Sequence, residues 1–192
     1  MKRVFMVHGW EGSPENNWFP WLKTKLRDNG FEVIAPTMPD TDKPVKSVWL
    51  KTLQNLITNP DKNTYLIGHS MGCQAIQRYL ESLQGDIVVG GAVLVAGWIN
   101  DPRWDGRTEE EAKVIHDWFD QPKDYDKIKS HCKKFISIFS SNDPFILKTN
   151  WKESEDILGA KVMILKNMSH FDDDAGIKKL PEALKALLEI SK

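Results

Sequence analysis

Cysteine is scarce in this chain: 192 residues contain only two, Cys73 and Cys132. They lie far apart in the sequence, they form no C-x-x-C pair, and they make no cluster of metal-ligand spacing with the five histidines. The sequence therefore offers neither a disulfide framework nor a zinc motif. We expect both thiols to be reduced and packed in the interior, and we expect no bound metal.

Long apolar runs and blocks of like charge are also missing. The apolar run after Lys2 and Arg3 ends within a few residues at His8-Gly9, which is too short for a secretory signal, and no later run reaches the length of a membrane span. The net charge is −1 and no basic block occurs, so the composition predicts neither a nucleic-acid partner nor an anionic membrane. The expected location is the cytoplasm.

Two nucleotide-binding signatures are absent as well. The first predicted strand is followed by the sequence HGWEG at residues 8–12, which lacks the G-x-G-x-x-G spacing of a dinucleotide-binding turn, and no P-loop occurs. We therefore expect no cofactor, and a small molecule as the ligand.

The chain alternates strand-like and helix-like segments from one end to the other. Short runs rich in β-branched and aromatic residues predict strands covered on both faces, at residues 3–8, 31–35, 64–68, 91–97, 134–140 and 160–166. Helical spacing lies between them at residues 17–29, 45–58, 71–83 and 177–190, with the regular part of the last helix beginning at Pro181. This order predicts an α/β fold, a three-layer α/β/α sandwich with a mainly parallel sheet of about six strands.

One segment departs from this rhythm. Residues 98–129 are acidic and rich in aromatic side chains, and they lie between two predicted strands. Because long insertions in compact domains are often functional, we expect one or two short helices that form a small cap over an edge of the sheet; a long surface connection is the alternative. No linker or repeat occurs elsewhere, so residues 1–192 are predicted to form a single domain.

Side chains of three chemically useful kinds follow the predicted strands. Ser70 follows the third strand in the sequence GHSMG of residues 68–72, Asp143 follows the fifth strand, and His170 follows the sixth. The carboxyl ends of parallel strands meet at one edge of the sheet, where ligands bind. A serine hydroxyl needs a base to become a nucleophile, His170 can serve near neutral pH, and Asp143 would orient the imidazole. The predicted catalytic residues are therefore Ser70, Asp143 and His170.

The negative charge that develops on the substrate oxygen needs hydrogen-bond donors. The N–H of Met71 lies at the predicted start of a helix, where the helix dipole favours an anion. A second donor is expected from the loop after the first strand, and the N–H of Trp10 is the simplest choice. Gly68 and Gly72 permit the tight turn from strand to helix.

The motifs together resemble those of the α/β-hydrolases, and more closely those of the family of small serine hydrolases that includes the retinoblastoma-binding hydrolase and YdeN. They span residues 4–171 in the family's order and read HGWEG, WFPWLKTKL, APTMPD, SVWLKTL, LIGHSMG, SNDPF and SHF. The resemblance implies a compact α/β-hydrolase fold. It also places the family's triad on Ser70, Asp143 and His170.

Several large apolar residues flank the predicted site. Trp10, Phe171 and Trp98 are candidate substrate-binding residues, with Trp104 as an alternative to Trp98 and Met71 as a further neighbour. For each of them, plain packing in the core is the competing interpretation.

The favoured function is a serine hydrolase that forms an acyl-enzyme and releases it with water. A carboxylic ester is the preferred substrate, and an amide could be cleaved by the same three groups. A protein-interaction module on a hydrolase scaffold is the alternative, although it gives the three groups no purpose. A non-hydrolytic member of the fold, such as a perhydrolase or a lyase, would use the same site. A protein partner or a homodimer stays open.

Overall fold

The structure is a computed structural model of the whole chain, of which residues 1–99 and 107–192 are described. Its centre is a sheet of six parallel strands in the order β2-β1-β3-β4-β5-β6. The strands are β1 (Arg3–Val7), β2 (Glu32–Ile34), β3 (Thr64–His69), β4 (Gly91–Val95), β5 (Phe135–Ser140) and β6 (Lys161–Leu165). All six predicted strands are confirmed.

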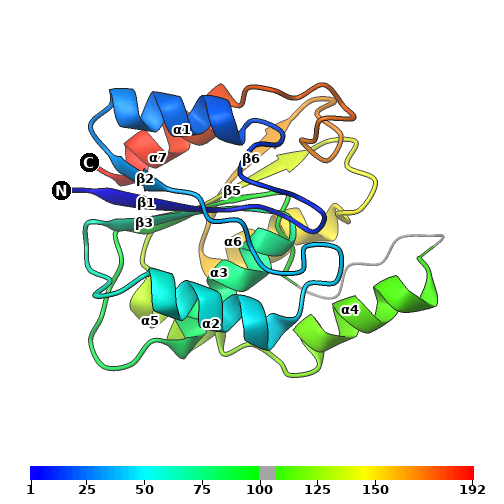
Figure 1. Cartoon of the computed structure of the whole chain (residues 1–192), viewed down its shortest axis with the longest axis horizontal. Helices are drawn as coiled ribbons and strands as arrows, with labels where there is room; N and C mark the ends of the chain where they lie inside the picture. Colours follow the sequence, from blue (N-terminus) through cyan, green and yellow to red (C-terminus); the bar gives the residue numbers. More distant parts are fainter. Residues whose placement is uncertain (100–106) are drawn as a thin grey trace.

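Helices cover both faces of the sheet (Figure 1), which confirms the three-layer α/β/α sandwich. One face carries α1 (Phe19–Asp28) and α7 (Pro181–Ile190). The other face carries α2 (Lys46–Leu56), α3 (Met71–Ser82), α5 (Tyr125–His131) and α6 (Thr149–Leu158). The central strands β3, β4 and β5 are buried along their whole length, because helices pack on both sides of them.

Helix α6 has no counterpart among the predicted elements. Its buried side includes two polar residues, Asn150 and Ser154. The Asn150 side chain accepts a hydrogen bond from the N–H of Ile99 (2.8 Å), and the Ser154 hydroxyl bonds to that of Ser137 (2.7 Å). Because these polar contacts replace apolar ones, the helix lacks the apolar stripe by which the others were recognised.

The segment predicted to form a cap contains two helices in its described part. Helix α4 (Glu109–Phe119) lies beyond the carboxyl ends of the strands, and α5 packs against α3. Residues 100–106 of the segment lie outside the described residues.

Side chains of helix α3 bind this segment at its start and near the end of α4. The side-chain amides of Gln74 and Gln77 donate to the backbone carbonyl of Trp98, at 2.5 and 3.4 Å. The guanidinium of Arg78 donates to the carbonyls of Trp118 (3.1 Å) and Gln121. These three side chains are buried, so the bonds are shielded from competing water.

Both cysteines are free and buried, as predicted. Burial raises the pKa of the Cys132 thiol to about 12, which keeps it protonated and unreactive at neutral pH. Within the described residues, no helix combines the length and the apolar character needed to cross a bilayer.

Candidate active site

Ser70 lies at the sharp turn between β3 and α3. Its backbone has φ 51° and ψ −121°, a region that residues with a Cβ rarely occupy. The flanking glycines make the turn possible: a Cβ on Gly72 would lie 2.1 Å from the carbonyl oxygen of Val7, and one on Gly68 would lie 2.8 Å from the N atom of Cys73. Strand and helix therefore approach more closely than any larger residue permits, and this geometry lifts the serine out of the sheet.

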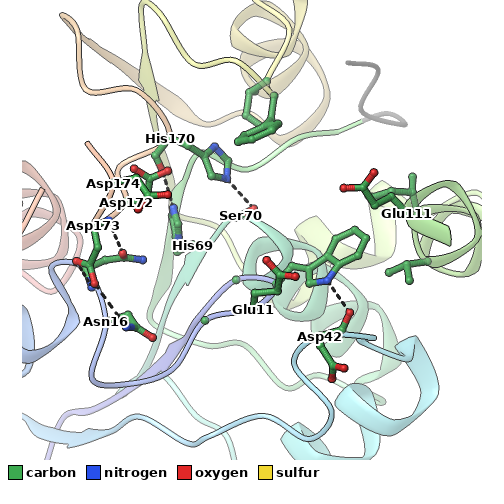
Figure 2. A pocket seen from close by; sticks show the side chains of 18 of the residues that line it. Glu11, Asn16, Asp42, His69, Ser70, Glu111, His170, Asp172, Asp173 and Asp174 are labelled. Carbon is green, nitrogen blue, oxygen red and sulfur yellow. Dashed lines mark hydrogen bonds between the residues drawn. The ribbon is translucent and has the colours of Figure 1, made fainter. Parts of the chain in front are cut away.

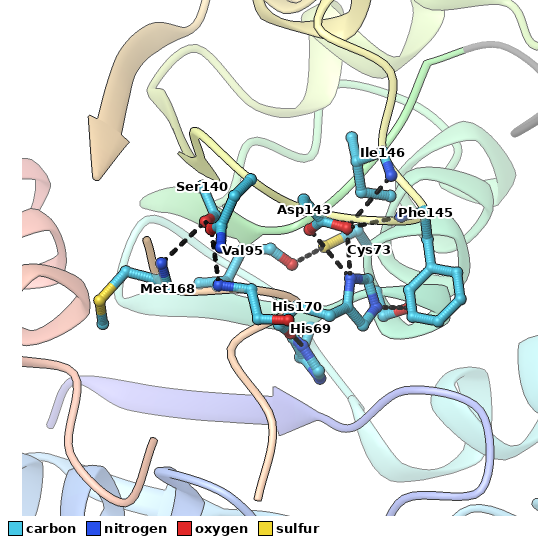
Figure 3. Close-up of polar contacts among 12 residues, drawn as sticks. His69, Cys73, Val95, Ser140, Asp143, Phe145, Ile146, Met168 and His170 are labelled. Carbon is cyan, nitrogen blue, oxygen red and sulfur yellow. Dashed lines mark hydrogen bonds and ion pairs between the residues drawn. The ribbon is translucent and has the colours of Figure 1, made fainter. Parts of the chain in front are cut away.

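The structure brings the three residues predicted to be catalytic together. The Nε2 atom of His170 lies 2.9 Å from Oγ of Ser70 (Figure 2). Its Nδ1 atom lies 2.9 and 3.1 Å from the two carboxylate oxygens of Asp143 (Figure 3). An ionised carboxylate can only accept, so Nδ1–H is the donor and Nε2 is free to accept the serine proton. The Asp143 side chain is only 2% exposed, and its Oδ1 also accepts from the N–H groups of Phe145 (2.9 Å) and Ile146 (3.1 Å).

A second histidine, His69, supports this arrangement from the end of β3. Its ring is buried, and its Nε2 lies 2.8 Å from the carbonyl oxygen of His170. Burial first, and the nearby His170 ring second, lower the pKa of His69 to about 3. The imidazole is therefore neutral at physiological pH and donates its proton to that carbonyl.

His8 has a comparable role in the loop that follows β1. Its Nδ1 donates to the carbonyl of Gly9 (2.8 Å), and its Nε2 accepts from the N–H of Met38 (3.0 Å). Burial lowers the pKa of His8, and only a neutral imidazole has both a donor and an acceptor. The ring thus fixes the shape of the loop that carries Trp10.

A cavity of about 530 Å³ opens over Ser70 and His170. The loop after β1, residues 42–43, helix α4, the turn after β5 and residues 172–174 form its walls. Trp10 and Trp98, two of the candidate substrate-binding residues, line it. Phe171 is fully buried and does not line it, and Trp104 lies outside the described residues.

Phe145 takes the position expected of Phe171. It lines the cavity, and its ring meets that of His170 edge-on, with the ring centres 4.9 Å apart. Phe145 was not among the predicted site residues, and neither were the lining residues Ile146, Val114 and Ile115. The position of Phe145 in the sequence could have indicated its role, because it follows Asp143 by two residues in a turn that must pass beside His170.

The cavity wall is strongly acidic, although the chain as a whole carries a net charge of only −1. Among the described residues, one lysine, Lys43, lines the cavity, and it pairs with Glu110 at 3.2 Å. The lining carboxylates are those of Glu11, Asp42, Glu110, Glu111, Asp172, Asp173 and Asp174.

The acidic run at residues 172–174 fixes a turn. Asp173 accepts from the N–H of Asn17 (2.8 Å) and pairs with Lys178 (2.6 Å), while Asp172 accepts from the N–H of Ala175 (2.9 Å). In the described part of the chain, no three acidic, histidine or cysteine side chains are grouped to hold a metal ion.

Comparison with known proteins agrees with this fold. The sequence model of the serine hydrolase family matches residues 4–189. The hydrolase YdeN of Bacillus subtilis (strain 168) is 31% identical over 180 residues, which cover 94% of this chain and 91% of YdeN. Serine hydrolase RBBP9 of Rattus norvegicus is 31% identical over 162 residues, 82% of this chain and 80% of the relative.

Solved structures show the same similarity. The crystal structure of the ydeN gene product from B. subtilis superimposes with a TM-score of 0.90 at 30% identity and covers 99% of this chain and 98% of that one. Est1E from Butyrivibrio proteoclasticus shares the fold, with a TM-score of 0.73 at 14% identity over 98% and 88% of the two chains. The resemblance found in the motifs is therefore confirmed, and the chain belongs to the serine hydrolase family.

Proposed function

We propose that this protein hydrolyses carboxylic esters through an acyl-enzyme on Ser70. The observation that carries the proposal is the continuous chain of hydrogen bonds from Asp143 through His170 to Ser70, which ends at an open cavity. A binding module on the same scaffold would have no need of a serine held in strained backbone geometry against a histidine.

The geometry supports a two-step reaction. Ser70 Oγ attacks the ester carbonyl carbon while its proton passes to Nε2 of His170, and the Asp143 carboxylate stabilises the imidazolium that forms. Collapse of the tetrahedral intermediate breaks the bond to the alkoxide, which takes the proton from His170. A water molecule then attacks the acyl-enzyme, again giving a proton to Nε2, and the carboxylic acid leaves as Ser70 recovers its proton.

The oxyanion of both intermediates would be held by the N–H groups of Trp10 and Met71. Met71 is the first residue of α3, so its N–H has no acceptor within the helix. The loop that carries Trp10 is in contact with the nucleophile, since a Cβ on Gly9 would lie 3.0 Å from that of Ser70. Two such donors would supply much of the transition-state stabilisation.

The cavity indicates the kind of ester. Trp10, Trp98 and Phe145 offer apolar surface for an acyl or leaving group of small to medium size. The carboxylates of the wall repel a negatively charged substrate, and a low-dielectric cleft concentrates that field. A neutral or cationic ester therefore fits better than an anionic one. Helix α4 would act as the cap that completes this cavity.

Labelling with a fluorophosphonate probe tests the proposal. The native protein should react, whereas Ser70→Ala should not, and His170→Ala should react at least about 1,000-fold more slowly. Ser130→Ala is the control, because this exposed serine bonds to the Lys127 carbonyl of its own helix and does not line the described part of the cavity. Hydrolysis of p-nitrophenyl esters of increasing acyl length would then define the substrate range. A folded native protein that neither reacts with the probe nor hydrolyses these esters would contradict the proposal.

A further inference from the structure

The loop that carries His170 has an unusual backbone. We call residues 167–171 the histidine loop. Three of its five residues, Asn167, Ser169 and Phe171, have positive φ angles of 55°, 47° and 59°. None of them is glycine, and residues with a Cβ rarely adopt this conformation unless their surroundings enforce it. Interactions with neighbouring residues must therefore stabilise this loop conformation.

Three consecutive side chains at the end of β5 contact this loop. We call Ser140, Ser141 and Asn142 the clamp. The Ser141 hydroxyl accepts from the N–H of Asn167 (3.1 Å). The Ser140 hydroxyl accepts from the N–H of Met168 (3.0 Å; Figure 3). The clamp therefore accepts hydrogen bonds from the first two backbone N–H groups of the histidine loop.

Asn142 completes the clamp. Its Oδ1 accepts from the N–H of Ser169 (3.0 Å) and from the hydroxyl of Ser140 (2.8 Å). The bonds of Ser140 and Asn142 form one connected network, whose members strengthen one another. Three successive amides of the histidine loop are thus paired with three successive residues of the turn that carries Asp143.

The opposite side of the loop is held as well. His69 donates to the carbonyl of His170, and the Phe171 side chain is fully buried in the core. The catalytic ring is therefore fixed between the clamp on one side and β3 on the other. Its two productive contacts, to Ser70 and Asp143, are both 2.9 Å long.

We propose that the clamp positions His170 for catalysis, so that Ser140, Ser141 and Asn142 are positioning residues of the hydrolase. This inference rests on the proposed function. Asn142 directly precedes Asp143. The same turn therefore fixes the position of Asp143 and, through the clamp, the position of His170, which Asp143 orients. A purely structural clamp would affect the stability of the fold, whereas a positioning clamp also sets the reaction rate of the folded molecule.

Asn142→Ala and Ser141→Ala test the proposal, with Ser130→Ala as the control. Asn142 is exposed, so its truncation opens no cavity in the core. For the folded fraction of Asn142→Ala, we expect the fluorophosphonate rate constant and kcat for an ester to fall about 10- to 100-fold, because small displacements of a catalytic group are costly. KM should stay within about threefold, since the clamp does not line the cavity. Ser141→Ala, which removes one bond, should show a smaller fall. Asn142→Asp keeps an acceptor oxygen and should recover most of the rate.

The hydrogen-bonded Nδ1–H of His170 gives a readout that does not need activity. Its downfield proton resonance should be present in the native protein and in Asn142→Asp, and broadened or lost in Asn142→Ala. Native rates per folded molecule in both Asn142→Ala and Ser141→Ala, with this resonance unchanged, would overturn the inference. A native protein that shows the resonance but no labelling would contradict the proposed function instead.

Discussion

Gly72→Ala is the sharpest test of how the site is built. A Cβ at this position would lie 2.1 Å from the Val7 oxygen, 2.7 Å from the His8 oxygen and 2.8 Å from the Val7 carbon. All three atoms belong to the backbone of β1 and its loop, so no side-chain rotation can relieve the overlap. The start of α3 must retreat from β1 by about 1 Å, a displacement that costs about 100-fold in rate when it reaches catalytic groups. Overpacking of this kind destabilises a protein by about 1–3 kcal/mol.

The assay measures the fluorophosphonate rate constant per folded molecule and the free energy of unfolding in urea. Gly85→Ala is the control for the added methyl group, because a Cβ at Gly85 would have no described atom within 4 Å; unlike Gly72, Gly85 has a positive φ of 65°. Because alanine is strained at a positive φ, we expect the control to lose about 1–2 kcal/mol of stability and to keep its rate. A Gly72→Ala protein that reacts at the native rate would refute the close approach of β1 and α3 as the basis of the site.

Three other predictions concern pH, charge and buried polar contacts. In the folded protein the pKa of His69 is about 3, which lies below its ordinary value of 6.5. Between these two pH values His69 is protonated in the unfolded chain and neutral in the folded protein. The free energy of unfolding should therefore fall as the pH is lowered from 6.5, by up to about 1.4 kcal/mol per pH unit from this residue. Urea unfolding between pH 5 and 7 should show that this free energy depends less steeply on pH in His69→Asn than in the native protein. An equal dependence on pH in the two proteins would contradict the lowered pKa of His69. The kcat/KM for phenyl acetate, which is neutral, should be about tenfold higher than that for the anion 4-acetoxybenzoate at low salt, and this ratio should decrease near 0.5 M salt. A ratio that does not depend on salt would exclude repulsion by the carboxylates of the cavity wall. Ser137→Ala should lower the free energy of unfolding by about 1–2 kcal/mol, because it leaves the buried Ser154 hydroxyl without its partner; an unchanged urea midpoint would contradict this.

The sequence was enough to predict the sheet and the meeting of Ser70, Asp143 and His170 at one of its edges. The central strands β3, β4 and β5 are continuous apolar runs because helices cover both of their faces, and this pattern is local. In a parallel sheet all the strands end at the same edge, so residues as far apart as Ser70 and His170 could be expected to meet. Their contact follows from topology, which the alternation of strands and helices already indicates.

The rest depends on features that leave no local pattern. Helix α6 was missed because Asn150 and Ser154 occupy its buried side. Phe171 was expected to line the pocket. It lies instead in the strained histidine loop with a positive φ, and its ring is buried in the core. The acidic wall was not foreseen either, because Glu11, Asp42 and the residues of α4 meet only once the chain is folded.

The three donors of α3 have a consequence for how this enzyme could change during evolution. Gln74, Gln77 and Arg78 bind carbonyl oxygens of the backbone at Trp98, Trp118 and Gln121, and every residue type carries such an oxygen. Mutations that alter the side chains between these anchors therefore leave the acceptors in place. Substitutions in α4 can therefore change the substrate preference, while α3, which begins beside Ser70, keeps both its sequence and its hydrogen bonds to the pocket wall.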